Sequence, residues 1–337
     1  MSCAAFLKRM GFEVTIFEAE SFAGGLLTKE LLPFRLPQED VDFEIQMLKD
    51  MGVKFEVNKK LGTDFTVDAL KEQGYQAFYF AIGKPDEIEP PFPIKGALTS
   101  HEFLFSINKV LKLKQGTTLP NYKNKKMLIL GAGDTAMDCA SAASRLGGEV
   151  TVAFRKAFKG MRASTKEIEH LLTQGIEFLP LFEPTNIDNG TVTFQMQEYG
   201  LDGKYKSLDE YMTRKYDVVI TAFGATLSKS KVLIPGKINK QQIEQQEGMY
   251  CGGDVANSQT VVEAVNDGKN AARMIANYLG EKGNMPVFTT EVDNVPLNTE
   301  FDGLKFINPF GIASAPISGT YECIKNSFKA GFGWAVT

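Results

Sequence analysis

The chain has 337 residues, of which 43% are apolar, enough to build the cores of two domains and part of a third. Its formal net charge of −4 argues against nucleic acid or a membrane surface as a partner, because phosphate groups favour basic faces. No apolar run approaches the roughly 20 residues that cross a bilayer, which excludes a membrane-spanning helix.

The cysteines and histidines predict no metal site. The amino-terminal residues lack the basic start and apolar stretch of a signal peptide. Neither His101 nor His170 has a second candidate ligand nearby in sequence, so each is interpreted as a structural or surface residue. We expect reduced thiols and a cytoplasmic protein, because the four cysteines are far apart and form no Cys-x-x-Cys: Cys3, Cys139, Cys251 and Cys323.

The first segment is typical of the second half of a βαβ unit. Residues 3–11 predict a helix and residues 13–17 a strand, whose partner strand and glycine-rich turn we expect before residue 1. Glu18 follows the strand, where a carboxylate suits an unphosphorylated adenosine ribose such as that of FAD, or is simply an exposed strand-end acid. Gly24 and Gly25 permit close approach to a ligand or form an ordinary turn.

Two later segments resemble each other. Residues 76–83 and 217–224 are both apolar strands that end in Ala-x-Gly, which favours two related nucleotide-binding lobes. Between them, the proline-rich residues 85–93 predict a loop or crossover.

The most complete unit spans residues 126–156. An apolar strand over residues 127–130 leads into Gly131-Ala132-Gly133, a helix begins at Asp134, and residues 150–154 form the next strand. The sequence from Gly131 to Ala136 has the G-x-G-x-x-A form, in which glycines let a pyrophosphate approach the amino end of a helix. This pattern indicates a dinucleotide site; the alternative is a turn that is merely tightly packed.

The residues after the second strand indicate which dinucleotide binds. Sites for NAD usually have an acidic residue at this position, whereas here Arg155 and Lys156 follow the strand and Arg162 comes shortly after. Guanidinium and ammonium groups suit the 2′-phosphate of NADPH. The alternative is a solvated basic loop.

A third strand, over residues 249–251, leads into Gly252-Gly253-Asp254, and a helix is predicted from Thr260. Asp254 suits a ribityl hydroxyl of a flavin, and the amino end of the helix suits a pyrophosphate; the alternative is a structural turn.

Residues 280–299 have the composition of a linker, after which a new element starts near Leu304. No nucleophile–base pair or Walker loop occurs, as expected for hydride transfer between cofactors.

With these features, the chain resembles the eukaryotic dihydropyrimidine dehydrogenase family over nearly its whole length. The stretches that carry the resemblance are Phe34–Pro37 with Val41–Glu44, Leu130–Ala136, Phe154–Lys156, Gly252–Val255 with Val265–Lys269, and Gly303–Gly311. Glutamate synthase small subunits resemble the middle of the chain but do not continue into the last of these.

The resemblance implies an α/β fold of tandem Rossmann-like FAD- and NAD(P)-binding lobes, as in glutathione reductase, plus the first segment of a TIM-type barrel. The implied domains are residues 1–125 and 229–285 for the two parts of the FAD lobe, 126–228 for the NADPH lobe, and 286–337 for a linker and the start of an FMN-binding barrel. FAD contacts are implied at Glu18, Gly24, Gly25, Leu26, Arg35, Leu61, Gly253, Asp254 and Thr260. NADPH contacts are implied at Gly131, Ala132, Gly133, Asp134, Thr135, Arg155, Lys156, Arg162, Ala222, Phe223 and Gly224, and an FMN contact at Ser314.

The implied function is NADPH-to-FAD electron input for the reduction of uracil and thymine by a homodimeric enzyme. In that family 4Fe-4S clusters carry electrons from FAD to FMN, but this chain lacks cysteines for any cluster, most of the barrel and the first FAD strand. We therefore expect that the chain alone does not reduce a pyrimidine. Two alternatives stay open: a glutamate synthase-type electron donor, and an inactive truncated product.

Overall fold

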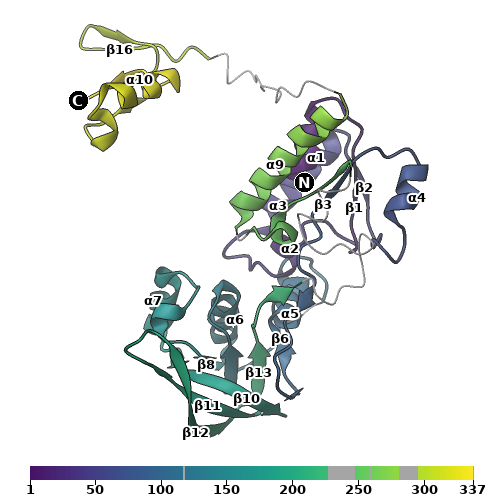
Figure 1. The fold of residues 1–337 in the computed structure, drawn as a ribbon, viewed down its shortest axis with the longest axis vertical. Coiled ribbons are helices and arrows are strands. Elements are labelled where there is room, and N and C mark those ends of the chain that lie inside the picture. The colour runs from purple at the N-terminus through teal and green to yellow at the C-terminus, as the bar shows by residue number, and fades with distance from the viewer. Residues whose placement is uncertain (117, 227–246, 259, 281–294, 337) are drawn as a thin grey trace. The chain divides into compact units, whose positions relative to one another are not determined.

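The computed structural model describes residues 1–116, 118–226, 247–258, 260–280 and 295–336. The chain divides into two compact units, residues 1–285 and 286–337 (Figure 1). None of the helices in the described ranges is long and apolar enough to cross a membrane.

The first unit contains a five-stranded parallel sheet with the order β6-β13-β7-β8-β9. The apolar run predicted near residue 127 forms β7, which is buried along four of its five residues. The predicted helix and second strand are also present, so the βαβ unit is confirmed. The strands are β6 (Leu98–Thr99), β7 (Lys126–Leu130), β8 (Glu149–Phe154), β9 (Glu177–Pro180) and β13 (Val218–Thr221).

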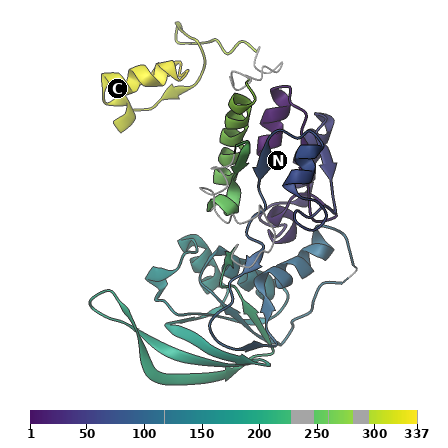
Figure 2. The same ribbon diagram turned by 45° about the vertical axis from the view of Figure 1, so that its right-hand side comes forward.

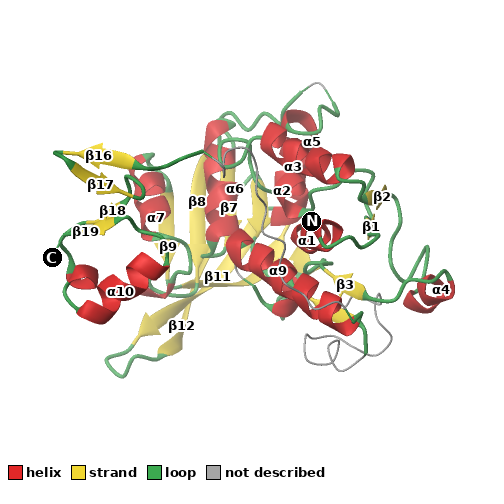
Figure 3. Ribbon diagram, turned by 90° about the horizontal axis from the view of Figure 1, so that it is seen from above, coloured by secondary structure: helices red, strands yellow, loops and turns green. Residues whose placement is uncertain are grey.

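Alternation along β7 divides the side chains of this lobe between two layers. Met127 and Ile129 pack into a core with the helices on one face, whereas Leu128 and Leu130 pack against an antiparallel sheet on the other. Figure 3 shows the helices over the strands of this lobe. The helices are α5 (Ser100–Leu111), α6 (Asp134–Arg145) and α7 (Thr165–Thr173).

The antiparallel sheet has the order β12-β11-β10-β5. Its long strands β11 and β12 form a hairpin that Figures 1 and 2 show in teal. The strands are β5 (Ile94–Lys95), β10 (Phe182–Asp188), β11 (Thr191–Tyr199) and β12 (Tyr205–Lys215).

The remainder of the first unit contains two parallel strand pairs, β1 with β2 and β3 with β15. The first predicted helix and the helix predicted from Thr260 are α1 and α9, which pack together. Gly268 allows this approach, because a Cβ at this position would lie 2.8 Å from the Cys3 backbone nitrogen. The helices are α1 (Ser2–Arg9), α2 (Leu26–Lys29), α3 (Gln38–Asp50), α4 (Val67–Glu72) and α9 (Val261–Tyr278). The strands are β1 (Thr15–Phe17), β2 (Lys54–Glu56), β3 (Phe78–Phe80) and β15 (Met249–Cys251).

The expectation about the crossover segment differs in detail from the structure. Residues 85–93 are not entirely loop, since β4 (Asp86–Glu87) pairs with β14 (Ala225–Thr226). Moreover, β6 pairs with β13, and α5 packs in the core of the five-stranded sheet, although both precede residue 126. The predicted domain boundaries stay predictions.

The second unit contains a hairpin followed by a βαβ unit. Strands β16 (Thr299–Phe301) and β17 (Leu304–Phe306) are antiparallel. Strands β18 (Gly311–Ile312) and β19 (Trp334–Ala335) are parallel and are joined through α10 (Tyr321–Lys329). Because one βαβ unit occurs in many α/β folds, the TIM-type barrel stays a prediction.

Candidate nucleotide-binding sites

The residues predicted to bind NADPH meet at the carboxyl edge of the five-stranded sheet. The Gly131 N–H donates to the Ala153 carbonyl (3.1 Å), and the Ala222 N–H donates to the Leu130 carbonyl (2.8 Å). The ends of β7, β8 and β13 are therefore neighbours. In open α/β sheets, ligands bind at such carboxyl ends.

The two glycines of the turn differ in their surroundings. Gly131 has φ +153°, and a Cβ there would overlap the carbonyl oxygen of Ala222. Gly133 has an ordinary backbone conformation as the N-cap of α6, and a Cβ there would meet no protein atom within 4 Å. Within the described part of the chain, no side chain caps the amino end of α6, which begins at Asp134 and continues with Thr135. The open side of Gly133 and the uncapped helix end fit a pyrophosphate.

Arg162 is held beside this turn by its backbone. The N–H groups of Arg162 and Ala163 both donate to the carbonyl of Ala132, at 2.9 and 3.2 Å. The loop after β8 therefore returns to the glycine turn. This long-range contact holds the backbone of a third cationic residue beside the glycine turn.

Arg155 and Lys156 follow β8, as predicted. The Arg155 side chain is 67% exposed, and its Nη1 lies 3.4 Å from Oε1 of Glu183 on β10. The backbone carbonyl of Lys156 accepts from the Leu181 N–H at 3.1 Å. Glu183 was not predicted as part of this site, because it lies 28 residues from Arg155 and has no local signal.

Residues 222–224 close the other side of the turn. Phe223 packs edge-on against Phe92, with ring centroids 6.1 Å apart. Gly224 has φ +99°, and its carbonyl accepts from the Ile88 N–H at 3.0 Å. The second Ala-x-Gly motif is thus anchored to the crossover segment.

Glu18 lies at the carboxyl end of β1, as predicted. Its Oε1 accepts from the Glu20 N–H at 3.0 Å, and burial raises the pKa of its carboxyl group. Gly24 and Gly25 follow, and a Cβ at Gly25 would meet no protein atom within 4 Å. The Leu26 side chain, at the start of α2, is exposed. A Cβ at Gly24 would instead lie 2.2 Å from Oγ1 of Thr28, so the open space at the end of β1 lies beside Gly25.

Arg35 makes contacts that the resemblance does not imply. Its guanidinium forms ion pairs with Asp138 on α6 and with Glu167 on α7. Asp138 is buried, and this burial raises the pKa of its carboxyl to about 6, although Arg35 opposes the shift. Arg35 thus joins the segment between α2 and α3 to the helices behind the glycine turn. Its FAD contact stays a prediction.

Asp267 organises the Gly-Gly-Asp turn. Its Oδ2 accepts from the Gly253 N–H at 2.9 Å and from the Ser258 hydroxyl. Burial raises the pKa of Asp254, and the nearby Lys84 opposes this shift.

Thr260 caps α9, where its side chain and that of Glu263 form a reciprocal capping box. The sequence analysis predicted the start of this helix but missed the role of Asp267.

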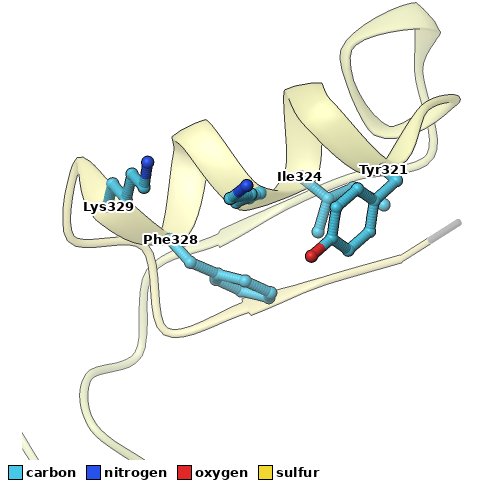
Figure 4. Close-up of a pocket in the computed structure, with 5 residues that line it drawn as sticks. Tyr321, Ile324, Phe328 and Lys329 are labelled. Atoms are coloured by element: carbon cyan, nitrogen blue, oxygen red, sulfur yellow. The ribbon is translucent and has the colours of Figure 1, made fainter.

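Leu61 and Ser314 belong to different units. Leu61 packs beside the core that contains Phe80 and Met249. Ser314 is exposed in the second unit, between β18 and α10. The surface pocket of that unit lies along α10, where Figure 4 shows side chains including Tyr321 and Phe328. It contains none of the predicted binding residues.

Among the described residues, no group of three or more His, Cys, Asp or Glu could hold a metal ion.

The predicted binding residues therefore fall into two groups in the first unit and one isolated position in the second. The NADPH residues gather around the glycine turn, where hydrogen bonds between backbones connect the three strand ends. Of the predicted FAD residues, Glu18 follows β1 and Gly253 and Asp254 follow β15, whereas Leu61 lies between β2 and α4 and Thr260 caps α9. Arg35 forms its ion pairs with α6 and α7.

Comparison with known proteins gives a family for this arrangement. The model of the pyridine nucleotide-disulphide oxidoreductase family matches residues 1–268. Among solved structures, Mycobacterium tuberculosis FprA in complex with NADPH has a TM-score of 0.66 at 14% identity, covering 82% of this chain and 83% of that one. The thioredoxin reductase of T. acidophilum has a TM-score of 0.58 at 16% identity, covering 83% of this chain and 94% of that one. The fold of tandem FAD- and NAD(P)-binding lobes is confirmed.

Curated relatives include proteins of several activities. The NAD-dependent dihydropyrimidine dehydrogenase subunit PreT of Escherichia coli O157:H7 is 30% identical over 83% of this chain and 66% of its own length. The NADP(+)-dependent formate dehydrogenase subunit beta of Moorella thermoacetica is 28% identical over 87% of this chain and 44% of its own. The putative oxidoreductase YgfK of Escherichia coli K12 is 33% identical over 66% and 22%. The chain thus spans between about a fifth and two thirds of the length of these relatives.

Proposed function

Because the chain belongs to the pyridine nucleotide-disulphide oxidoreductase family, we propose that it binds NADPH and FAD and passes electrons from the first to the second. The observation that carries this proposal is the convergence of the Gly131–Gly133 turn with Arg155, Lys156 and Arg162. When bound, the nicotinamide supplies a hydride and the flavin accepts it.

The residues of the chain hold and orient the two nucleotides. Gly133 and the amino end of α6 would bind the NADPH pyrophosphate through backbone N–H groups, because no side chain caps that end. Arg155, Lys156 and Arg162 would neutralise the 2′-phosphate. Positioning of this kind is the main contribution that a protein makes to hydride transfer.

The FAD would lie at the ends of β1 and β15. Glu18 would accept a hydrogen bond from the adenosine ribose, and Asp254 from the ribityl chain. Asp267 fixes the backbone of Gly253 beside that position. Both carboxyl groups are partly buried, so their hydrogen bonds to a ligand gain strength from the reduced exposure to water.

The electrons leave through a group other than a disulphide of this chain. Its cysteines are free, and Cys3, Cys139 and Cys251 are buried. Burial raises the pKa of the Cys3 thiol to about 12 and that of Cys139 well above its ordinary value. Thiols of this kind are unreactive. A separate acceptor is therefore part of the proposal.

We propose that the final acceptor is a pyrimidine such as uracil or thymine. The PreT match and the Gly303–Gly311 stretch support this assignment. The test is NADPH-dependent formation of 5,6-dihydrouracil by protein purified from its native source, measured by mass spectrometry. NADPH oxidation that proceeds without uracil or thymine being reduced would contradict the assignment.

A second candidate is an electron-donating subunit for a different partner, as in glutamate synthase. The match to the formate dehydrogenase subunit, which covers 87% of this chain, favours it. Both candidates share the NADPH-to-FAD step. Anaerobic addition of NADPH to FAD-reconstituted protein tests that step, and we expect the flavin absorbance to bleach. An unchanged spectrum would contradict both candidates and favour an inactive product.

A further inference from the structure

The loop that carries the cations for NADPH is held from the side by the antiparallel sheet. The Leu181 N–H, just before β10, donates to the Lys156 carbonyl at 3.1 Å. The Ala157 N–H donates to the hydroxyl of Tyr205 on β12 at 3.3 Å. Tyr205 belongs to the antiparallel sheet, and Leu181 lies between β9 and β10, where the chain passes from the parallel sheet into the antiparallel one. Both residues lie outside the βαβ unit, so the unit does not fix this loop alone.

Glu183 on β10 competes for Arg155. Its carboxylate lies 3.4 Å from the guanidinium Nη1, and its side chain is 34% exposed. A carboxylate and a 2′-phosphate use the same guanidinium donors, and the two anions repel each other when close together. A 2′-hydroxyl brings no such repulsion. Glu183 therefore opposes a phosphorylated ribose more than an unphosphorylated one.

Tyr205 fixes the backbone of the loop. Its ring packs on that of Tyr199, with centroids 4.8 Å apart. A Cβ on Gly160 would lie 2.9 Å from the Tyr205 hydroxyl oxygen and 3.0 Å from side-chain atoms of Lys156. The loop is thus packed closely around this hydroxyl, which orients the backbone that carries Arg155 and Lys156.

We infer that the antiparallel sheet tunes the preference of this site for a 2′-phosphate. Glu183 is a specificity-determining residue that limits the preference, and Tyr205 is a positioning residue that maintains it. This inference rests on the proposed NADPH site. The ligand class is an adenosine 2′-phosphate, as in a phosphorylated pyridine nucleotide.

The test compares the binding of adenosine 2′,5′-bisphosphate with that of 5′-AMP by calorimetry. In Glu183→Gln we expect the bisphosphate to bind about two- to fivefold more tightly, a change in affinity that corresponds to the energy of an exposed charge pair. We expect 5′-AMP to bind as before. The matched control is Glu198→Gln, which removes an exposed carboxylate of β11 that faces Lys206 across the strands. We expect neither probe to change in the control.

Tyr205→Phe keeps the ring and removes the hydroxyl. We expect bisphosphate affinity to fall about two- to tenfold, the range for one hydrogen bond, with little change for 5′-AMP. If wild-type protein shows no preference for the bisphosphate, the NADPH site and this inference both fail. If wild-type protein prefers the bisphosphate but Glu183→Gln binds both probes unchanged, the inference is overturned and the NADPH site stands.

Discussion

Single residues around the glycine turn have separable roles in folding and in binding. Gly131 is required by the protein itself, since its φ of +153° and the nearby Ala222 carbonyl exclude a side chain. Gly133 has neither constraint, so its lack of a side chain leaves space beside the helix end for a ligand. This contrast permits a paired experiment.

Gly131→Ala is expected to lower the free energy of unfolding by roughly 1–3 kcal/mol or more, because of backbone strain and overlap. Gly133→Ala is expected to leave stability nearly unchanged and to weaken NADPH binding about five- to hundredfold, through overlap with the pyrophosphate. Urea unfolding and fluorescence titration measure the two effects. Equal loss of stability in both variants would contradict the distinction.

Arg155→Ala is expected to weaken NADPH binding far more than NADH binding. Losing a charged partner of a phosphate costs about 1.5–3 kcal/mol, roughly tenfold to a hundredfold in affinity. Arg273→Ala, at an exposed position on α9, is the matched control and should alter neither affinity. Equal losses for NADPH and NADH in Arg155→Ala would refute a 2′-phosphate role.

Local patterns predicted the residues whose role depends on a strand end or a turn. Gly131, Gly133 and Arg155 follow strands with clear apolar runs, and the structure has them at the carboxyl edge of the sheet. Glu183 and the Arg35–Asp138 pair were not predicted, because these contacts join residues 28 and 103 positions apart. Such pairings depend on which distant elements pack together, and a local sequence pattern does not show that packing.

At the scale of elements, α6 connects the nucleotide site to the remainder of the first unit. Its amino end is open beside Gly133, and one turn later Asp138 receives Arg35 from the segment after α2. Asp138 is only 8% exposed, and burial outweighs Arg35 in setting its pKa. The negative charges of Glu167 and Asp134 also raise the pKa of Asp138.

The raised pKa of Asp138 predicts a pH dependence of stability. A folded pKa of about 6, above the ordinary value of 3.8, means that the stabilising contribution is complete below pH 3.8 and is lost as the pH rises through 6. The loss between pH 4.5 and pH 7 is on the order of 2 kcal/mol. Asp138→Asn should lack this slope. Urea unfolding between pH 4.5 and pH 7 measures it, and parallel pH profiles for the two proteins would contradict the assignment.

Element types were predicted better than their extents. The strand predicted over residues 76–83 is confirmed only at Phe78–Phe80, since backbone pairing with β15 ends there. The packing of α5 against the five-stranded sheet was also missed. Its apolar face is visible in the sequence, but the partner of an amphipathic helix is not.

At the scale of the whole molecule, the first unit contains every predicted binding residue except Ser314. Its buried cysteines are Cys3, Cys139 and Cys251, whereas Cys323 in the second unit is partly exposed. The thiols therefore differ in access to solvent, and the burial of the first three excludes them from exchange with a disulphide partner.

Thiol labelling of the native protein is expected to modify Cys323 and to leave the three buried cysteines unmodified. Unfolded protein, in which all four thiols are accessible, is the control. Mass spectrometry of the labelled peptides identifies the reactive positions. Rapid modification of Cys139 or Cys251 in the native state would contradict the buried environment and reopen thiol chemistry as an electron route.

The central claim is that this chain passes a hydride from NADPH to FAD. The most direct test is stopped-flow reduction of FAD-reconstituted protein under anaerobic conditions, using NADPH with hydrogen or deuterium at the transferred position of the nicotinamide. We expect flavin bleaching by NADPH, slower bleaching by the deuterated form, and much weaker reduction by NADH at equal concentration. A flavin that binds but is not bleached by NADPH would contradict it.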